Sequence, residues 1–160
     1  MSEGLTAFDI KILEVLQKDA SLSTAEIAER VGLSQSPCWR RLQRLREEGY
    51  ISRQVAILNR EKLNNVIFII STLKMSTLTD EQRREFLRKI DAIPEILECY
   101  TIFGDRDVMI KVAAPSMPWY QTFLTDVVLK LPGVLDAQSI VTLAELKHTT
   151  AIPLRGNLSL

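Results

Sequence analysis

The spacing of apolar residues changes near residue 60 of this 160-residue chain. Before that point, apolar side chains recur every three or four positions, which is the pattern of amphipathic helices. After it, β-branched and apolar runs of strand length alternate with helical segments. The sequence therefore predicts an α+β chain with two domains: residues 1–60, which end in a connecting strand or linker, and residues 61–160.

Three helices are predicted within residues 1–60. The first begins at Thr6. Its apolar stripe consists of Leu5, Phe8, Ile12, Val15 and Leu16. The second begins with a capping box of Ser23 and Glu26 and ends at Gly32, and the third begins after Ser34. Two short helices joined by a tight turn indicate a helix-turn-helix, whose second member is the helix after Ser34.

That third helix carries four arginines within residues 40–46 and no acidic residue within residues 34–46, although the whole chain has 20 basic and 20 acidic residues. Its outward face suits the major groove of DNA. The residues predicted to read bases are Ser36, Arg40 and Gln43. The other predicted DNA contacts are Ser34, Trp39, Arg41, Arg44 and Arg46, and the last three are expected to bind phosphates. Trp39 is either an anchor beside the phosphates or the edge of the core.

A solvated surface helix is the alternative interpretation of this arginine-rich face. Such a helix normally interleaves Glu with Arg four residues apart, and here the first acid after Ser34 is Glu47. The capped helix and the glycine turn that precede the face also fit a DNA-binding motif. We therefore favour DNA binding.

The remaining residues predict strands and helices in the order βαββαβ. Residues 54–59 read as a strand that leaves the first domain, and residues 66–75 (VIFIISTLKM) as a strand largely buried on both faces. A helix over residues 79–92 is expected to turn Phe86, Leu87 and Ile90 inward. Strands over 96–103 and 108–113, a helix over 116–131 and a strand over 134–146 follow. This order is the ferredoxin-like arrangement, which hosts many unrelated functions.

Four segments spread along the chain share features with one family. GLSQSPCWRRLQRLREEGYI, ECYTIFGDRDVMIKV, LPGV and SIVTLAELK resemble the recognition helix, the Gly-Asp-x-Asp turn and the closing segments of the Lrp/AsnC family of transcriptional regulators. PCWRRLQRL together with KHTTAIPL resembles the branch that regulates cysteine catabolism. The resemblance implies a DNA-binding regulator of amino-acid metabolism genes, with a helix-turn-helix domain followed by a ferredoxin-like βαββαβ domain.

The resemblance also implies partners for the second domain. Family members dimerise through it, often assemble further into tetramers or octamers, and bind a small effector, usually an amino acid, between such domains. The residues that match effector positions are Phe103, Gly104, Asp105, Arg106, Asp107 and Ser139. Backbone N–H groups of such a turn suit a carboxylate, and Asp105 or Asp107 suits an ammonium group. A solvated hairpin turn is the alternative.

The chain departs from the family pattern in two segments. Phe103 stands where many members have Ser or Thr, and Ala137 with Ser139 replaces a Thr-x-Thr pair. A more apolar pocket, an unusual ligand or no ligand would fit these residues.

No catalytic constellation accompanies these motifs. His148 is the only histidine, so neither a Ser-His-Asp triad nor a site with several histidines is expected, and Asp105 with Asp107 is poor evidence for magnesium. We expect no enzymatic activity, no metal and no cofactor. No apolar stretch has the length of a membrane helix and no secretory signal is recognised, so we expect a cytoplasmic protein with Cys38 and Cys99 reduced.

Two other functions remain open at this stage. One is an architectural DNA-binding protein without an effector, which the departures at Phe103 and Ala137 allow. The other is a ferredoxin-like protein that binds a small molecule but not DNA, with a helical N-terminus that mediates protein contacts.

Overall fold

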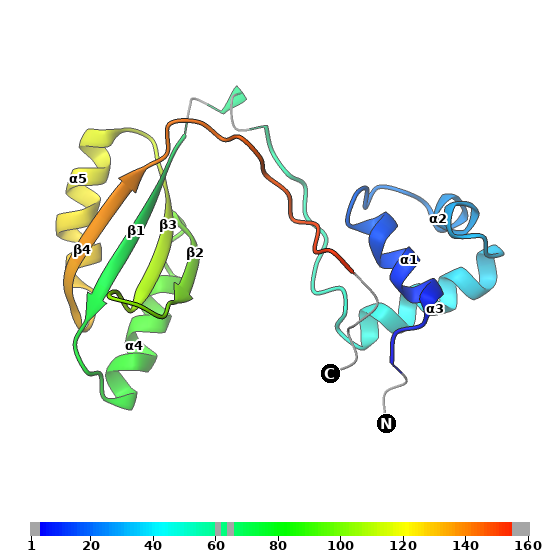
Figure 1. Ribbon diagram of the computed structural model, residues 1–160, viewed down its shortest axis with the longest axis horizontal. Helices are drawn as coiled ribbons and strands as arrows, with labels where there is room; N and C mark the ends of the chain where they lie inside the picture. Colours follow the sequence, from blue (N-terminus) through cyan, green and yellow to red (C-terminus); the bar gives the residue numbers. More distant parts are fainter. Residues whose placement is uncertain (1–3, 60–61, 64–65, 155–160) are drawn as a thin grey trace. The chain divides into compact units, whose positions relative to one another are not determined.

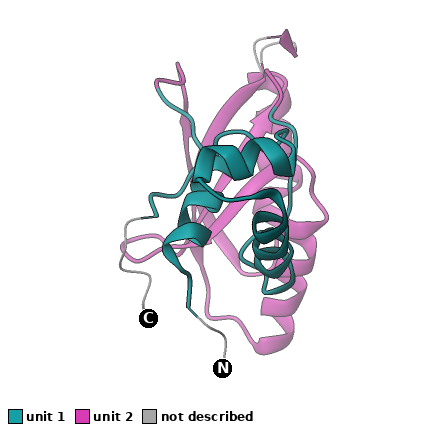
Figure 2. Ribbon diagram, turned by 90° about the vertical axis from the view of Figure 1, so that its right-hand side faces the viewer, with its two compact units in different colours: residues 1–57, 147–160 teal, residues 58–146 magenta. Residues whose placement is uncertain are grey.

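The computed structural model describes residues 4–59, 62–63 and 66–154. The chain divides into two compact units, residues 1–57 with 147–160 and residues 58–146 (Figure 2). The boundary expected at residue 60 placed the C-terminal segment with the second domain, whereas residues 147–154 belong to the first unit. Leu154 contacts the helical core, and the Gln17 side chain exchanges two hydrogen bonds with the backbone of Ile152, of 3.0 and 2.6 Å.

The first unit contains three helices: α1 (Ala7–Leu16), α2 (Thr24–Val31) and α3 (Gln35–Glu47) (Figure 1). The helix starts predicted at Thr6 and at Ser23 are confirmed, and both residues form capping boxes with the third residue of their helix. Gly32 ends α2 with a φ of 75°, a conformation that glycine adopts without strain. The order and packing of these helices confirm the predicted helix-turn-helix.

The buried face of α1 is rotated relative to the apolar stripe that the sequence predicted. Phe8, which was predicted to face inward, is 37% exposed, whereas Asp9 and Leu13 are buried. Asp9 contacts two arginines of α3, so a polar interaction as well as apolar burial sets the rotation of α1. The buried apolar residues of the unit are Ile12, Leu13, Ile27, Ala28, Val31, Cys38, Leu42 and Leu45.

The strand predicted over residues 54–59 is wrong. These residues have no regular structure, and Val55, Ile57 and Leu58 are each about two-thirds exposed. A strand needs backbone hydrogen bonds from a neighbouring strand, and none of the strands in the described residues pairs with this segment. Residues 60, 61, 64 and 65 of the predicted linker lie outside the described residues.

The second unit has the predicted order βαββαβ. Its elements are β1 (Ile67–Met75), α4 (Asp80–Asp91), β2 (Ile96–Thr101), β3 (Val108–Ala114), α5 (Met117–Asp126), the 3-10 turn η2 (Val128–Lys130) and β4 (Val134–Val141). The strands form one sheet in the order β2-β3-β1-β4, with every pair antiparallel. The ferredoxin-like prediction is therefore confirmed. The last strand stops at Val141 and not at residue 146, because β1, its only neighbour, begins at Ile67 and Val141 already pairs with Ile69.

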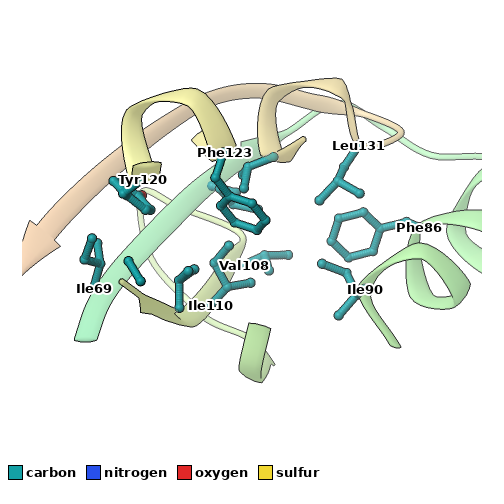
Figure 3. Close-up of a cluster of buried hydrophobic side chains, with 12 residues drawn as sticks. Ile69, Phe86, Ile90, Val108, Ile110, Tyr120, Phe123 and Leu131 are labelled. Carbon is teal, nitrogen blue, oxygen red and sulfur yellow. The ribbon is translucent and has the colours of Figure 1, made fainter. Parts of the chain in front are cut away.

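Both long helices of this unit cover the same face of the sheet. Figure 3 shows Phe86 and Ile90 of α4 and Tyr120 and Phe123 of α5 gathered with the strand residues of the core. Along β1 the buried residues alternate, so the prediction that this strand is largely buried on both faces is wrong. Leu87, which was expected to turn inward, is 56% exposed because α4 meets the sheet only through the face with Phe86 and Ile90.

The turn between η2 and β4 depends on a glycine. Gly133 has a φ of 76°, and its carbonyl accepts a 2.8 Å hydrogen bond from the Ser76 N–H. A Cβ at this position would lie 2.1 Å from Cδ2 of Leu78. The position therefore excludes a side chain for two reasons, backbone conformation and close approach.

We expect Gly133→Ala to lower the free energy of unfolding of the second unit by roughly 2 kcal/mol, from strain at positive φ and from the contact with Leu78. The cost should be smaller in a Leu78→Ala background, where the contact is absent. Denaturant unfolding of the four variants measures the coupling. Gly32→Ala, at a φ of 75° with no atom within 4 Å, reports the backbone strain alone. Equal costs of Gly133→Ala in both backgrounds would contradict the role given to Leu78.

Candidate nucleic-acid interface and effector site

Helix α3 exposes most of the residues predicted to contact DNA. Ser36, Arg40 and Arg46 are exposed, and Gln43 is half-buried. Trp39 is 52% exposed, which favours a surface position beside the arginines over the edge of the core. The apolar face of the helix is buried as predicted.

Arg41 and Arg44 differ from the other arginines because both bind one buried carboxylate. Nη1 of Arg41 lies 3.1 Å from Oδ1 of Asp9, and Nη2 of Arg44 lies 2.6 Å from Oδ2. Asp9 is completely buried, and the two arginine side chains are 32% and 26% exposed. Thr6 completes the cluster: its N–H and hydroxyl donate to Oδ2 over 2.8 and 2.6 Å, and Arg41 donates to the Thr6 hydroxyl over 3.0 Å.

These partners determine the ionisation of Asp9. Burial alone raises the pKa of a carboxyl group, but the hydrogen bonds from Thr6 and Arg41 and the charge of Arg44 outweigh it. The pKa of Asp9 is therefore below its ordinary value of 3.8, and the group is a carboxylate at neutral pH.

A pocket lies beside this cluster on the surface of the first unit, with a volume of about 590 Å³. Its lining consists of Gly4, Thr6, Pro37, Arg40, Arg41 and Arg44. We call it the arginine pocket. Three arginines line it, and the buried Asp9 carboxylate behind Arg41 and Arg44 compensates only one of their charges, so the pocket is positive and suits an anion.

Sequence reasoning missed Asp9, although the sequence carries a local signal for it. Thr6 and Asp9 have the three-residue spacing of a capping box, and both reciprocal bonds are present. The contact with α3 joins residues 32 and 35 positions apart, which no local pattern contains. Ser34 occupies the N-cap position of α3 as predicted, but its hydroxyl makes no capping hydrogen bond there.

The Gly104–Asp107 turn of the second unit is held against β1 and β4. The Asp107 carboxylate accepts a 2.8 Å hydrogen bond from the Met75 N–H and lies 3.3 Å from Nζ of Lys74. The Met75 N–H and the Lys74 ammonium, opposed by a weaker effect of burial, hold the pKa of Asp107 below its ordinary value. Arg106 forms an ion pair with Asp136 of β4. Of the two acids predicted to bind an ammonium group, Asp107 therefore already anchors the turn.

The other turn residues project to solvent. Phe103 and Asp105 are exposed, and the Asp105 carboxylate has no hydrogen bond or ion pair within the described part of the chain. Gly104 has a φ of 146°, which favours glycine. An apolar ring and an unengaged carboxylate thus flank a turn whose backbone is fixed.

Ser139 lies on the helix-covered side of β4 in a cluster of three hydroxyl groups. Its Oγ lies 2.5 Å from the hydroxyl of Tyr120, which lies 2.6 Å from Oγ of Ser71. Ser71 is fully buried. The sequence predicted a strand there but no hydrogen-bonding role for this residue. A serine inside an apolar strand is the signal that would have marked it, because a buried hydroxyl needs a partner.

Residues 4–59, 62–63 and 66–154 contain no group of three or more His, Cys, Asp or Glu residues that could hold a metal ion. None of the helices in this part of the chain has the length and apolar character needed to cross a membrane.

Comparison with known protein families divides the chain in the same way. A family model described as a winged helix-turn-helix DNA-binding domain matches residues 5–52, and one described as the Lrp/AsnC ligand binding domain matches residues 68–152. In this structure the residues from 52 to 59 contain no strand, so a strand wing is absent from that segment.

Individual relatives match nearly the whole chain. The leucine-responsive regulatory protein of Haemophilus influenzae is 34% identical over 154 residues, which cover 96% of this chain and 93% of that protein. The glutamate uptake regulatory protein of Zymomonas mobilis is 33% identical over the same shares. A transcriptional regulator of Neisseria meningitidis, solved as a complex with L-Met, has a TM-score of 0.89 and 36% identity, covering 94% of this chain and 97% of that chain. An AsnC family regulator of Agrobacterium tumefaciens has a TM-score of 0.88 and 33% identity over the same shares.

The depressed pKa of Asp9 predicts a pH-dependent contribution to the stability of the first unit. A carboxylate with a pKa below its ordinary value stabilises the fold above about pH 4, and this contribution disappears as the pH falls through the folded-state pKa. We expect Asp9→Asn to lower the free energy of unfolding by about 2 kcal/mol at pH 7, since the arginines lose a charged partner.

The difference between the wild type and Asp9→Asn should shrink as the pH is lowered from 5 to 3. Trp39 fluorescence in a Trp119→Phe background reports unfolding of the first unit, because the second tryptophan lies in the other unit. A difference that stays constant across this pH range would contradict the assignment of a buried, ionised Asp9.

Proposed function

The chain belongs to the Lrp/AsnC family of transcriptional regulators, and we propose that it binds specific duplex DNA through α3 and responds to an amino acid at the Gly104–Asp107 turn. The observation that carries the DNA-binding part is the surface of α3 together with the arginine pocket. Exposed arginines, an adjacent positive pocket and a core-packed opposite face are what a major-groove helix requires.

The residues of α3 divide into two roles in this proposal. Ser36, Arg40 and Gln43 read base edges, since they lie opposite the buried stripe. Arg46 contacts a phosphate, and Arg41 and Arg44 do so from the wall of the arginine pocket. Ser34 and Trp39 contact the sugar-phosphate backbone at the sides of the helix.

The proposed effector is an amino acid with an apolar side chain. Relatives of this chain are named for leucine, and a structurally similar regulator was solved with L-Met. In this chain, Asp105 supplies a carboxylate for the α-ammonium group, backbone N–H groups of the turn suit the α-carboxylate, and Phe103 supplies apolar surface. Arg106, Asp107 and Ser139 shape the site through their contacts with Asp136, Met75 and Tyr120, respectively.

The proposal includes a homodimer that assembles further into tetramers or octamers. The sheet face opposite α4 and α5 supports it, because its apolar residues are only half-buried or exposed in the single chain. These residues include Phe68, Ile70, Met109 and Ile140. A second copy would bury them.

We place this regulator in the cytoplasm, where bacterial DNA lies, and assign it no catalytic activity and no cofactor. The cysteine-catabolism branch stays a prediction.

An architectural DNA-binding protein without an effector is the second candidate. The hydroxyl of Ser139 and the side chains of Arg106 and Asp107 are all engaged within the chain, which leaves few polar groups for a ligand. The response of DNA binding to amino acids distinguishes the two functions.

We expect Arg46→Ala to weaken binding to all duplexes alike and to reduce the slope of log K against log salt by about 0.9, the value for one lost phosphate contact. Gln43→Ala should instead relax the preference for particular base pairs with the slope unchanged. Fluorescence anisotropy with matched and mutated duplexes measures both. Arg84→Ala, an exposed arginine of α4, is the control for net charge. An unchanged slope for Arg46→Ala would contradict its phosphate contact.

We expect one apolar amino acid to change the affinity for DNA from the promoter of the chain's own gene, measured by anisotropy across a salt series with each of the twenty amino acids. Asp105→Asn should abolish this response and leave the affinity without amino acid unchanged, because Asp105 lies outside the DNA-binding unit. Glu145→Gln is a control for the loss of one carboxylate. Tight, salt-dependent binding that no amino acid changes would favour the architectural function.

A further inference from the structure

Asp9 is one of only two fully buried polar residues among those that the structure describes, and it is the only charged one. Burial of a carboxylate is unfavourable unless hydrogen bonds and opposite charges compensate for it. An apolar residue would fill the same position in α1 without this requirement. The role of the Asp9 carboxylate therefore follows from the residues that it contacts.

Those partners come from consecutive turns of the recognition helix. Arg41 and Arg44 are three residues apart, and each directs one guanidinium nitrogen to a different oxygen of Asp9, over 3.1 and 2.6 Å. The hydroxyl of Thr6 contacts both Asp9 and Arg41. Arg41 also lies over the ring of Phe8, 5.8 Å from its centre. Long side chains that are otherwise flexible are thus fixed on the face of α3.

The exposed parts of the same two arginines line the arginine pocket with Arg40. Asp9 compensates one of the two positive charges of Arg41 and Arg44, so one remains for a ligand, and Arg40 adds to the positive potential of the pocket. A phosphodiester group carries one negative charge and accepts hydrogen bonds from guanidinium groups in paired geometry. The charge, the donors and the location on the DNA-facing helix all fit a backbone phosphate of duplex DNA.

We propose that Asp9 is a positioning residue that fixes Arg41 and Arg44 as the walls of a binding site for one DNA backbone phosphate. This inference rests on the proposed DNA-binding function. It adds to that function a buried acid on another helix, which acts through the arginines and does not touch DNA.

Positioning and simple electrostatics predict opposite effects of removing the Asp9 charge. If Asp9 only lowered the positive charge of the surface, Asp9→Asn would strengthen DNA binding, because the neutral side chain leaves one more uncompensated cation. If Asp9 positions the arginines, the same variant weakens binding, because the phosphate contacts lose their geometry.

The experiment compares full-length wild type, Asp9→Asn and Asp19→Asn by fluorescence anisotropy with a labelled promoter duplex across a salt series. Asp19 is an exposed acid of the same unit that contacts Ser21, so its variant changes the net charge equally. We expect Asp9→Asn to lower the affinity about tenfold and the salt slope by about 0.9, and Asp19→Asn to lower neither. Equal or tighter binding by Asp9→Asn would overturn the proposal.

Arg44→Lys provides a second test, and its effect with Asp9 present can be measured even if Asp9→Asn is not folded at the assay temperature. Lysine keeps the charge but not the planar guanidinium geometry. We expect it to lower the affinity with Asp9 present and to have a smaller effect in the Asp9→Asn background, which a purely structural role of Asp9 would not produce. Wild-type affinity for Arg44→Lys would overturn the proposal. Absence of salt-dependent duplex binding by the wild type would instead contradict the proposed function itself.

Discussion

The first unit depends on one buried carboxylate and the charges that compensate for it. Asp9 lies between α1 and α3, and without Arg41, Arg44 and Thr6 its burial would be strongly unfavourable. The rotation of α1 follows this interaction, since Asp9 is buried while the apolar Phe8 remains partly exposed. The interaction therefore links the packing of the helical core to the arrangement of arginines on α3.

The second unit depends on a different constraint, which is that a sheet with helices on one side leaves its other side uncovered. The helices α4 and α5 bury alternate residues of β1 and β3, and the residues between them stay half-buried. The turn before β3 is held at the sheet through Asp107, whose carboxylate contacts the backbone at the end of β1. The fold thus presents two distinct surfaces, a partly apolar sheet face suited to a second copy and a fixed turn suited to a small ligand.

Local patterns predicted most of the fold. Capping boxes, glycine turns and periodicity gave the helix starts at Thr6 and Ser23, the end of α2 at Gly32, and the order βαββαβ. The errors share a physical cause, because each concerned a residue whose environment depends on distant parts of the chain. Residues 54–59 have strand composition but no neighbouring strand among the described residues, and Leu87 is apolar but lies off the face of α4 that meets the sheet.

The sequence by itself determined the two-domain order, helix α3 with its acid-free arginine cluster and the glycine turn of the second unit, because each depends on residues close together in the chain. Only the tertiary structure decided that Arg41 and Arg44 bind Asp9 while Arg40 and Arg46 remain exposed, and that Asp107 anchors its turn while Asp105 projects from it. Residues of one type received different roles because the position of a charged side chain depends on the partners that folding brings within hydrogen-bonding distance. Sequence spacing does not specify those partners.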